Sequence, residues 1–139
     1  MGTWDVGPFD NDTAADWCGG FDDAAPDARR GLVRNTLARA AEATDYLDAD
    51  VGDNAIAAAA LVAAQCPGGE PAHPHYGPKQ PAPDLTGLRT LALRALDRVL
   101  TEPSELLELW AESDDAPWHT TINGLRSTLT PQLPQNRPA

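Results

Sequence analysis

The feature that most limits the possible folds is an alanine-rich apolar segment near the middle of the chain. From residue 53 to residue 66 it reads Asp-Asn-Ala-Ile-Ala-Ala-Ala-Ala-Leu-Val-Ala-Ala-Gln-Cys. A helix that is apolar nearly all round is buried on most sides, and small side chains let neighbouring helices approach closely. Asp53 is a suitable N-cap, and Pro67 stops the helix. We therefore predict a central helix over 53–66.

Helical periodicity recurs on both sides of this segment. A helix is predicted over 27–45, with Asp27 as its N-cap, four arginines on its wetter side and a buried stripe. The stripe consists of Leu32, Val33, Leu37, Ala40, Ala41 and Thr44, and continues to Leu47. Those arginines are Arg29, Arg30, Arg34 and Arg39.

Three more helices are predicted in the second half of the chain. One begins near Thr86 and ends before Pro103, and Ser104 caps the next. That second helix holds Leu106, Leu107, Leu109 and Trp110. Asp114 or Asp115 caps the last helix. Its core face steps by four, three and four residues through Trp118, Ile122, Leu125 and Leu129.

No segment alternates polar and apolar residues long enough to indicate a strand, so the predicted fold class is all-α. We expect a single-domain bundle of about five helices over residues 1–130, with an extended N-terminal segment. Residues 67–84 contain six prolines and three glycines in eighteen positions and are predicted to form an irregular connector. Residues 131–139 are expected to fray.

The charge of the chain restricts its partners. With 21 acidic and 10 basic residues the formal net charge is -11, which argues against nucleic acid and against an anionic membrane surface. The first 25 residues contain six acids and no Lys or Arg. These acids are Asp5, Asp10, Asp12, Asp16, Asp22 and Asp23. They form either a solvated surface or a recognition surface for a basic protein.

Two further observations concern the compartment. The opening has no positively charged region followed by an apolar stretch, and no apolar run is long enough to span a bilayer. We therefore expect a cytoplasmic protein, in which Cys18 and Cys66 are most simply buried thiols.

The first seventeen residues are the most distinctive part of the sequence. Trp4 and Phe9 are apolar anchors on either side of a turn at Gly7, and Asn11 or Asp12 caps a short helix that buries Trp17. Gly2, Gly7 and Pro8 prevent a helix before Asp10.

This opening resembles the bacterial "domain of unknown function" family 4259. Its members begin Met-Gly-x-Trp-Gly-x-Gly-x-Phe-Asn/Asp-Asn-Asp-x-Ala-x-Asp, a motif matched here by Trp4, Gly7, Phe9, Asn11, Asp12, Ala14 and Asp16. The resemblance continues through residues 46–50, the alanine-rich helix and residues 104–110. Asp5 stands where the family usually has Gly. The resemblance implies no catalytic residues, because none are assigned in the family.

The remaining candidates for chemistry each have a structural alternative. Asp10, Asp12 and Asp16 supply three carboxylates for Mg²⁺ or Ca²⁺, but the Gly and terminal Glu of an EF-hand are missing, and a helix start and a bond to an Arg explain two of them. His73, His75 and Cys66 invite a zinc site, but a Pro-rich connector favours surface histidines.

Arginines four apart, at 30 and 34 and at 94 and 98, favour salt bridges within the fold. His119 has no fixed nucleophile or orienting carboxylate predicted beside it, so no catalytic residue is assigned.

These observations favour a non-enzymatic, acidic protein-binding module: an inhibitor, an immunity-type protein or a regulatory subunit. Its predicted binding residues are Asp10, Asn11, Asp12, Asp16, Asp22 and Asp23. The alternatives are a metal-dependent enzyme or hydrolase with its site at the N-terminal carboxylates, and a purely architectural role for Trp4 and Phe9. No cofactor and no bound metal are predicted, and the sequence leaves the oligomeric state open.

Overall fold

The computed structural model describes residues 12–66, 78, 83–112 and 116–130, and every regular element within them is helical. The elements are α1 (Asp12–Asp23), the 3-10 turn η1 (Pro26–Ala28), α2 (Arg29–Ala41), α3 (Ala49–Ala64), η2 (Thr86–Leu88), α4 (Arg89–Val99), α5 (Glu105–Ala111) and α6 (Ala116–Leu129). The all-α prediction is confirmed, with six α-helices in this part of the chain where about five were predicted. None of its helices has the length and apolar character needed to cross a membrane.

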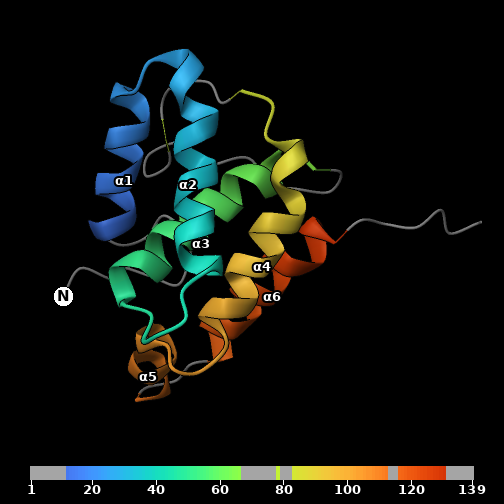
Figure 1. The fold of residues 1–139 in the computed structure, drawn as a ribbon. Helices are drawn as coiled ribbons and strands as arrows, with labels where there is room; N and C mark the ends of the chain where they lie inside the picture. Colours follow the sequence, from blue (N-terminus) through green and yellow to red (C-terminus); the bar gives the residue numbers. More distant parts are fainter. Residues whose placement is uncertain (1–11, 67–77, 79–82, 113–115, 131–139) are drawn as a thin grey trace, which may run out of the picture.

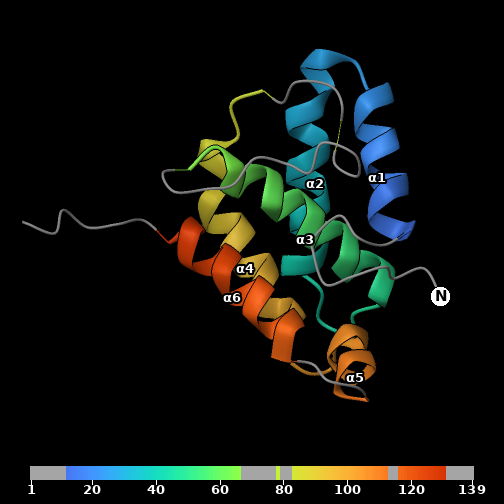
Figure 2. The same ribbon diagram turned by 180° about the vertical axis from the view of Figure 1, so that it is seen from behind.

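The alanine-rich segment forms the centre of the fold. α3 packs against each of the other five α-helices. α2 and α4 pack against each other and lie side by side across the front of α3 in Figure 1, and Figure 2 shows α3 from behind, in front of both. Ten of its residues are buried: Gly52, Ala55, Ile56, Ala57, Ala58, Ala59, Ala60, Leu61, Val62 and Ala63. The predicted central helix is confirmed, but its predicted start was wrong. α3 begins at Ala49, after Asp48, so Asp53 lies inside the helix.

α1 and α2 form the first helical pair. α1 buries Ala14, Cys18 and Phe21, while Trp17 is half-buried rather than buried as predicted. The reason is its polar edge: the indole Nε1 donates a hydrogen bond of 2.9 Å to Thr36 Oγ1 on α2. This bond fastens the two helices at their rim.

The predicted start of the second helix and the predicted exposure of Arg29 were both wrong. Residues 26–28 form the η1 turn, so α2 begins at Arg29 and Asp27 does not cap it. The Arg29 side chain is buried, because its Nε and Nη2 donate to the carbonyl oxygens of Phe21 (3.1 Å) and Asp22 (3.2 Å) at the end of α1. Its guanidinium also lies 5.6 Å from the centre of the Phe21 ring.

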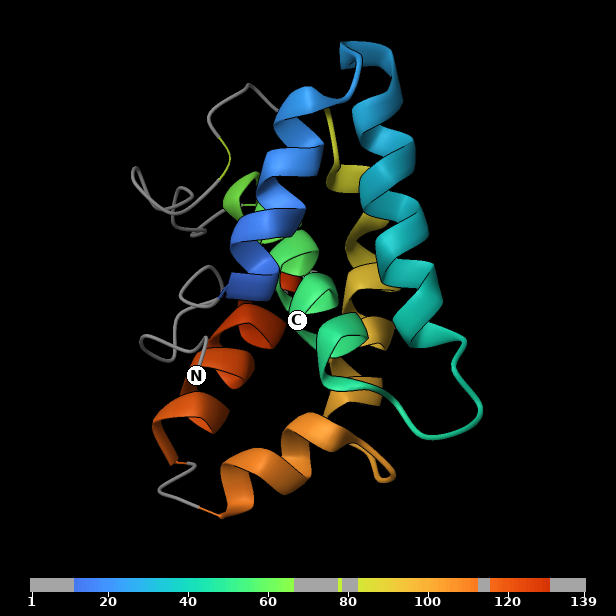
Figure 3. The ribbon, with the colours of Figure 1, turned by 90° about the vertical axis from the view of Figure 1, so that its left-hand side faces the viewer.

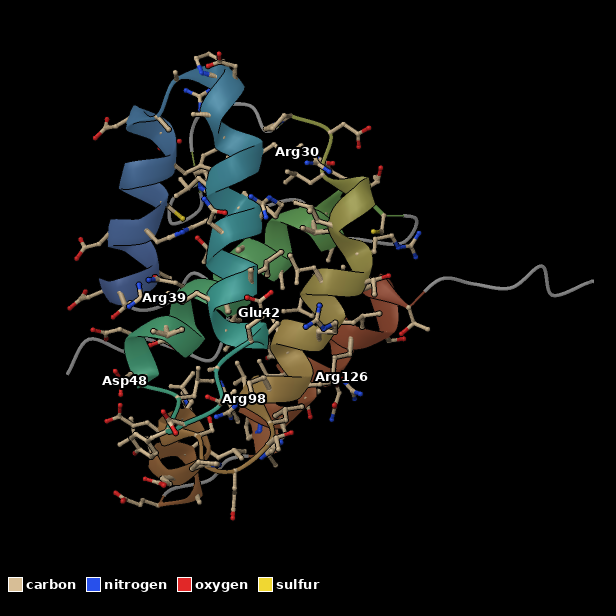
Figure 4. All side chains as sticks on the ribbon, viewed as in Figure 1. Arg30, Arg39, Glu42, Asp48, Arg98 and Arg126 are labelled. Carbon is tan, nitrogen blue, oxygen red and sulfur yellow. The ribbon has the colours of Figure 1, made fainter. Side chains whose placement is uncertain are left out.

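Arg98, one of the four arginines expected to form salt bridges, bonds to backbone oxygens instead. Within the described residues one ion pair is found, between Arg126 Nε and Asp97 Oδ1 at 2.8 Å. Arg98 instead donates to carbonyl oxygens of Ala43, Asp45, Thr101 and Pro103, and Arg89 donates to the Leu129 oxygen at the end of α6. Figure 4 shows Arg98 on α4 and Arg126 on α6. The last carbonyls of a helix lack intrahelical donors, and a guanidinium offers several.

For the other predicted helices, the buried faces agree with the structure better than the first and last residues do. Trp118, Ile122 and Leu129 of α6 are buried, while Leu125 is half-buried. Ser104 precedes α5 as predicted, but its hydroxyl makes no capping bond. Helix 27–45 is shorter than predicted, since α2 ends at Ala41 and Thr44 is exposed. Asp114, Asp115, most of the 67–84 connector and the tail 131–139 lie outside the described residues.

Candidate interaction surfaces

The first candidate surface is the outer side of α1. Asp12, Asp16 and Asp23 are exposed, and their spacing of four and seven places them on one side of the helix. Asp22 is half-buried, and its carbonyl oxygen accepts the bond from Arg29. The structure therefore brings three of the predicted binding residues together. Asp10, Asn11, Trp4, Gly7 and Phe9 lie outside the described residues.

A second acidic region, which the sequence analysis did not find, lies where α3 begins and α5 begins. We call it the α5 corner and define it as Tyr46, Asp48, Asp50, Asp53, Glu105, Glu108, Leu109 and Glu112. α5 is the short helix at the lower end of the molecule in Figure 1, beside the start of α3 in Figure 3. Asp48 lies at this end of α3 in Figure 4.

Backbone hydrogen bonds join the two parts of the α5 corner. The Leu47 nitrogen donates to the Pro103 oxygen (3.1 Å), and the Glu105 nitrogen donates to the Leu47 oxygen (2.9 Å). The Glu105 carboxylate, through Oε1, accepts from the backbone nitrogen of Ala49 at 2.7 Å and so satisfies the first turn of α3. Side chains separated by more than fifty residues in the sequence are thereby held together.

Gly52 explains how closely α5 approaches α3. A Cβ atom added at Gly52 would lie 2.7 Å from Leu106 Cδ1 and 3.4 Å from its Cγ. Leu106 is the buried residue of α5. Gly52 thus leaves the space that the Leu106 side chain fills, and the exposed side of α5 faces solvent.

Asp53 has the most perturbed carboxyl group of the corner. Burial, followed by the nearby carboxylates of Asp50 and Glu105, raises the pKa of Asp53 to about 7. Both causes disfavour the charged form, and the group is therefore only partly ionised at neutral pH. Perturbed carboxyls of this kind occur both at functional sites and in structural networks.

Tyr46 lies at the outer edge of the corner. Its hydroxyl donates a hydrogen bond of 2.8 Å to Glu108 Oε1. This bond, with burial and the negative charges of Glu108, Glu105 and Asp48, raises the pKa of Tyr46 to about 12. The phenol is therefore neutral at physiological pH, and its surroundings have a negative potential. From the sequence, Tyr46 was identified only as part of residues 46–50, a segment that resembles the family.

Metal and nucleophile candidates gain little support from the described residues. No group of three or more His, Cys, Asp or Glu side chains in this part of the chain is placed to hold a metal ion. Asp10, His73 and His75 lie outside it. Cys18 and Cys66 are buried and not joined to each other, and the Cys66 thiol donates to the Val62 oxygen at 3.4 Å. His119 packs edge-on against Trp118, with ring centres 5.1 Å apart.

Taken together, the fold and these surfaces define a small all-α protein with an alanine-rich central helix and acidic outer helices. The chain belongs to the family described as "Domain of unknown function (DUF4259)", whose model matches residues 2–121. This match confirms the family indicated by the opening motif. No curated protein and no solved structure matches the chain.

Proposed function

We propose that this protein is a non-enzymatic protein-binding module that associates with a basic protein partner through its acidic helices. One observation carries the proposal: three of the described helices carry acidic residues without a basic one, although α4 also holds Asp97 beside its arginines. The arginines of the described residues all lie on α2, α4 and α6, whereas α1, α3 and α5 contain no Lys or Arg. Figure 4 labels arginines on α2, α4 and α6, and it labels Asp48 at the start of α3.

Such a separation favours association with an oppositely charged protein. A surface of one sign steers a complementary partner and raises the association rate, while like-charged partners are rejected. The net charge of -11 adds a long-range term of the same sign. We place this association in the cytoplasm, where a reducing environment keeps buried thiols such as Cys18 and Cys66 unbridged.

The test is affinity capture from the native lysate at low and at physiological salt, read by mass spectrometry. We expect one dominant basic protein, whose capture weakens as salt screens the charges. Asp16→Lys/Asp23→Lys on the exposed side of α1 should reduce capture further. The matched control is Asp27→Lys/Glu42→Lys, at two other exposed positions, which changes the net charge by the same amount. Capture of nothing, or capture insensitive to salt and to both variants, would reject the proposal.

A further inference from the structure

The described residues expose two large apolar side chains, and both belong to the α5 corner. Tyr46 is 46% exposed and Leu109 is 48% exposed. They lie near each other, because the Tyr46 hydroxyl is bonded to Glu108, the residue before Leu109. Exposed apolar side chains that lie together on one part of a surface often mark an interaction site.

The helical spacing shows which side chains accompany them. On α5 and its C-terminal continuation, Glu105, Glu108, Leu109 and Glu112 are three or four residues apart and so share one side. Leu106, which is buried beside Gly52, lies next to this side rather than at its centre, since it follows Glu105 by one residue. The outward side therefore combines an apolar centre with carboxylates around it.

No basic side chain of the described residues neutralises these carboxylates. Arg98 reaches the loop beside the corner, but its guanidinium is bonded to backbone oxygens of Ala43, Asp45, Thr101 and Pro103. The one ion pair in this part of the chain, Arg126 with Asp97, involves α6 and α4. Within the described residues, Glu108 and Glu112 thus make no ion pair.

We propose that the outward side of the α5 corner docks a short basic, amphipathic segment of the partner protein. Its apolar side chains pack on Tyr46 and Leu109, and its Lys or Arg side chains meet Glu108 and Glu112. The inference rests on the proposed function for the sign of the partner's charge. It goes further than the proposed function because it places the anchoring contact on α5. The sequence alone favours the acidic residues of α1.

The chemistry of the corner suits this occupant better than an all-polar one. Binding energy in protein interfaces concentrates in a few anchors, among which Tyr is enriched, surrounded by a polar rim. The exposed tyrosine ring also attracts a cationic head group over its face. The outer side of α1 has no comparable anchor, since Asp12, Asp16 and Asp23 share it with Gly19 and Gly20, also exposed.

The experiment uses the full chain, labelled with ¹⁵N, and a synthetic helical peptide of lysine and leucine as the probe. A peptide in which serine replaces leucine at equal charge is the control. We expect amide shifts at residues 45–48 and 105–112 and at least about tenfold tighter binding of the leucine peptide, equivalent to about 1.4 kcal/mol. Leu109→Ser should weaken that binding by about tenfold, while Asn35→Ser at another exposed position should leave it unchanged.

Three results would overturn the inference. Shifts confined to α1 would leave the proposed function standing and remove α5 as its anchoring surface. Equal binding of the two peptides, or unchanged binding by Leu109→Ser, would show that the apolar centre contributes nothing. Self-association of the protein through residues 105–112 without peptide would assign the surface to a second copy. By contrast, salt-insensitive lysate capture would be a failure of the proposed function itself.

Discussion

α1 and α5 are both acidic helices without a basic residue, yet they are attached to the protein in different ways. α1 buries three residues, and it is held near its middle by the Trp17–Thr36 bond and at its C-terminal end by Arg29. α5 buries Leu106 beside Gly52, and a backbone bridge and one carboxylate join it to the start of α3. Its Leu107 and Trp110 are partly buried against the core, and Trp110 stacks on Trp118 of α6 with ring centres 5.8 Å apart. The outer side of α1 is therefore polar, whereas the outward side of α5 includes an exposed leucine, Leu109.

The largest expected effect tests how firmly α1 is attached. Phe21 is fully buried and also lies under the Arg29 guanidinium, so Phe21→Ala removes both packing and that contact. We expect a loss of about 3–5 kcal/mol in the free energy of unfolding, measured by urea denaturation. A loss below about 1 kcal/mol would show that Phe21 does little to hold α1.

A second prediction concerns the titration of the α5 corner. The pKa of Asp53 is raised to about 7 from an ordinary value of 3.8, so the folded state holds a proton that the unfolded state releases between these values. The contribution of Asp53 to stability is therefore greatest below about pH 4, falls as pH rises toward 7 and is lost above it. Asp53→Asn should stabilise the protein by about 2–4 kcal/mol at pH 8, and this gain should shrink toward zero near pH 4.

Denaturation curves at several pH values measure this effect. Asp16→Asn, which removes an exposed carboxylate from α1, is the matched control. If both variants behaved alike at pH 8, the buried carboxyl would not distinguish the α5 corner from α1.

A smaller effect is expected at the rim between α1 and α2. Thr36→Val removes the acceptor of the Trp17 indole while keeping the shape of the side chain. Leaving a half-buried donor without its partner should cost about 1–2 kcal/mol. Trp17→Phe in the Thr36→Val background removes the unpaired donor and should recover part of that loss, since neither partner then remains unsatisfied. No recovery would indicate that the bond itself contributes little to holding α1.

The smallest expected effect is spectroscopic. Glu108→Gln removes both the charged acceptor and the largest nearby negative charge, so the pKa of Tyr46 should fall from about 12 toward its ordinary value of 10. The ring carbon that bears the hydroxyl reports this by ¹³C NMR: at pH 11 the variant should be largely ionised and the native protein largely neutral. Identical titrations would separate Tyr46 from the carboxylates and weaken the case for one joint surface.

The sequence predicts well what depends on local periodicity. The buried body of α3 and the face of α6 follow from apolar spacing, which needs no knowledge of distant residues. The start of α3 was missed because Asp48 and Asp53 are both acceptable N-caps, and the choice depends on Glu105 reaching the Ala49 nitrogen. The α5 corner was missed for the same reason, since Tyr46 and Glu108 are 62 residues apart.

The three arginines bonded to backbone oxygens have a consequence for how the protein responds to its solvent. Arg29, Arg89 and Arg98 fasten helix ends to oxygens that carry no formal charge, at distances too short for dissolved ions to enter. Added salt weakens attraction between exposed, separated charges far more than such close bonds. Ionic strength should therefore affect partner binding and folding stability differently. Added salt should release a basic partner while the free energy of unfolding stays nearly unchanged.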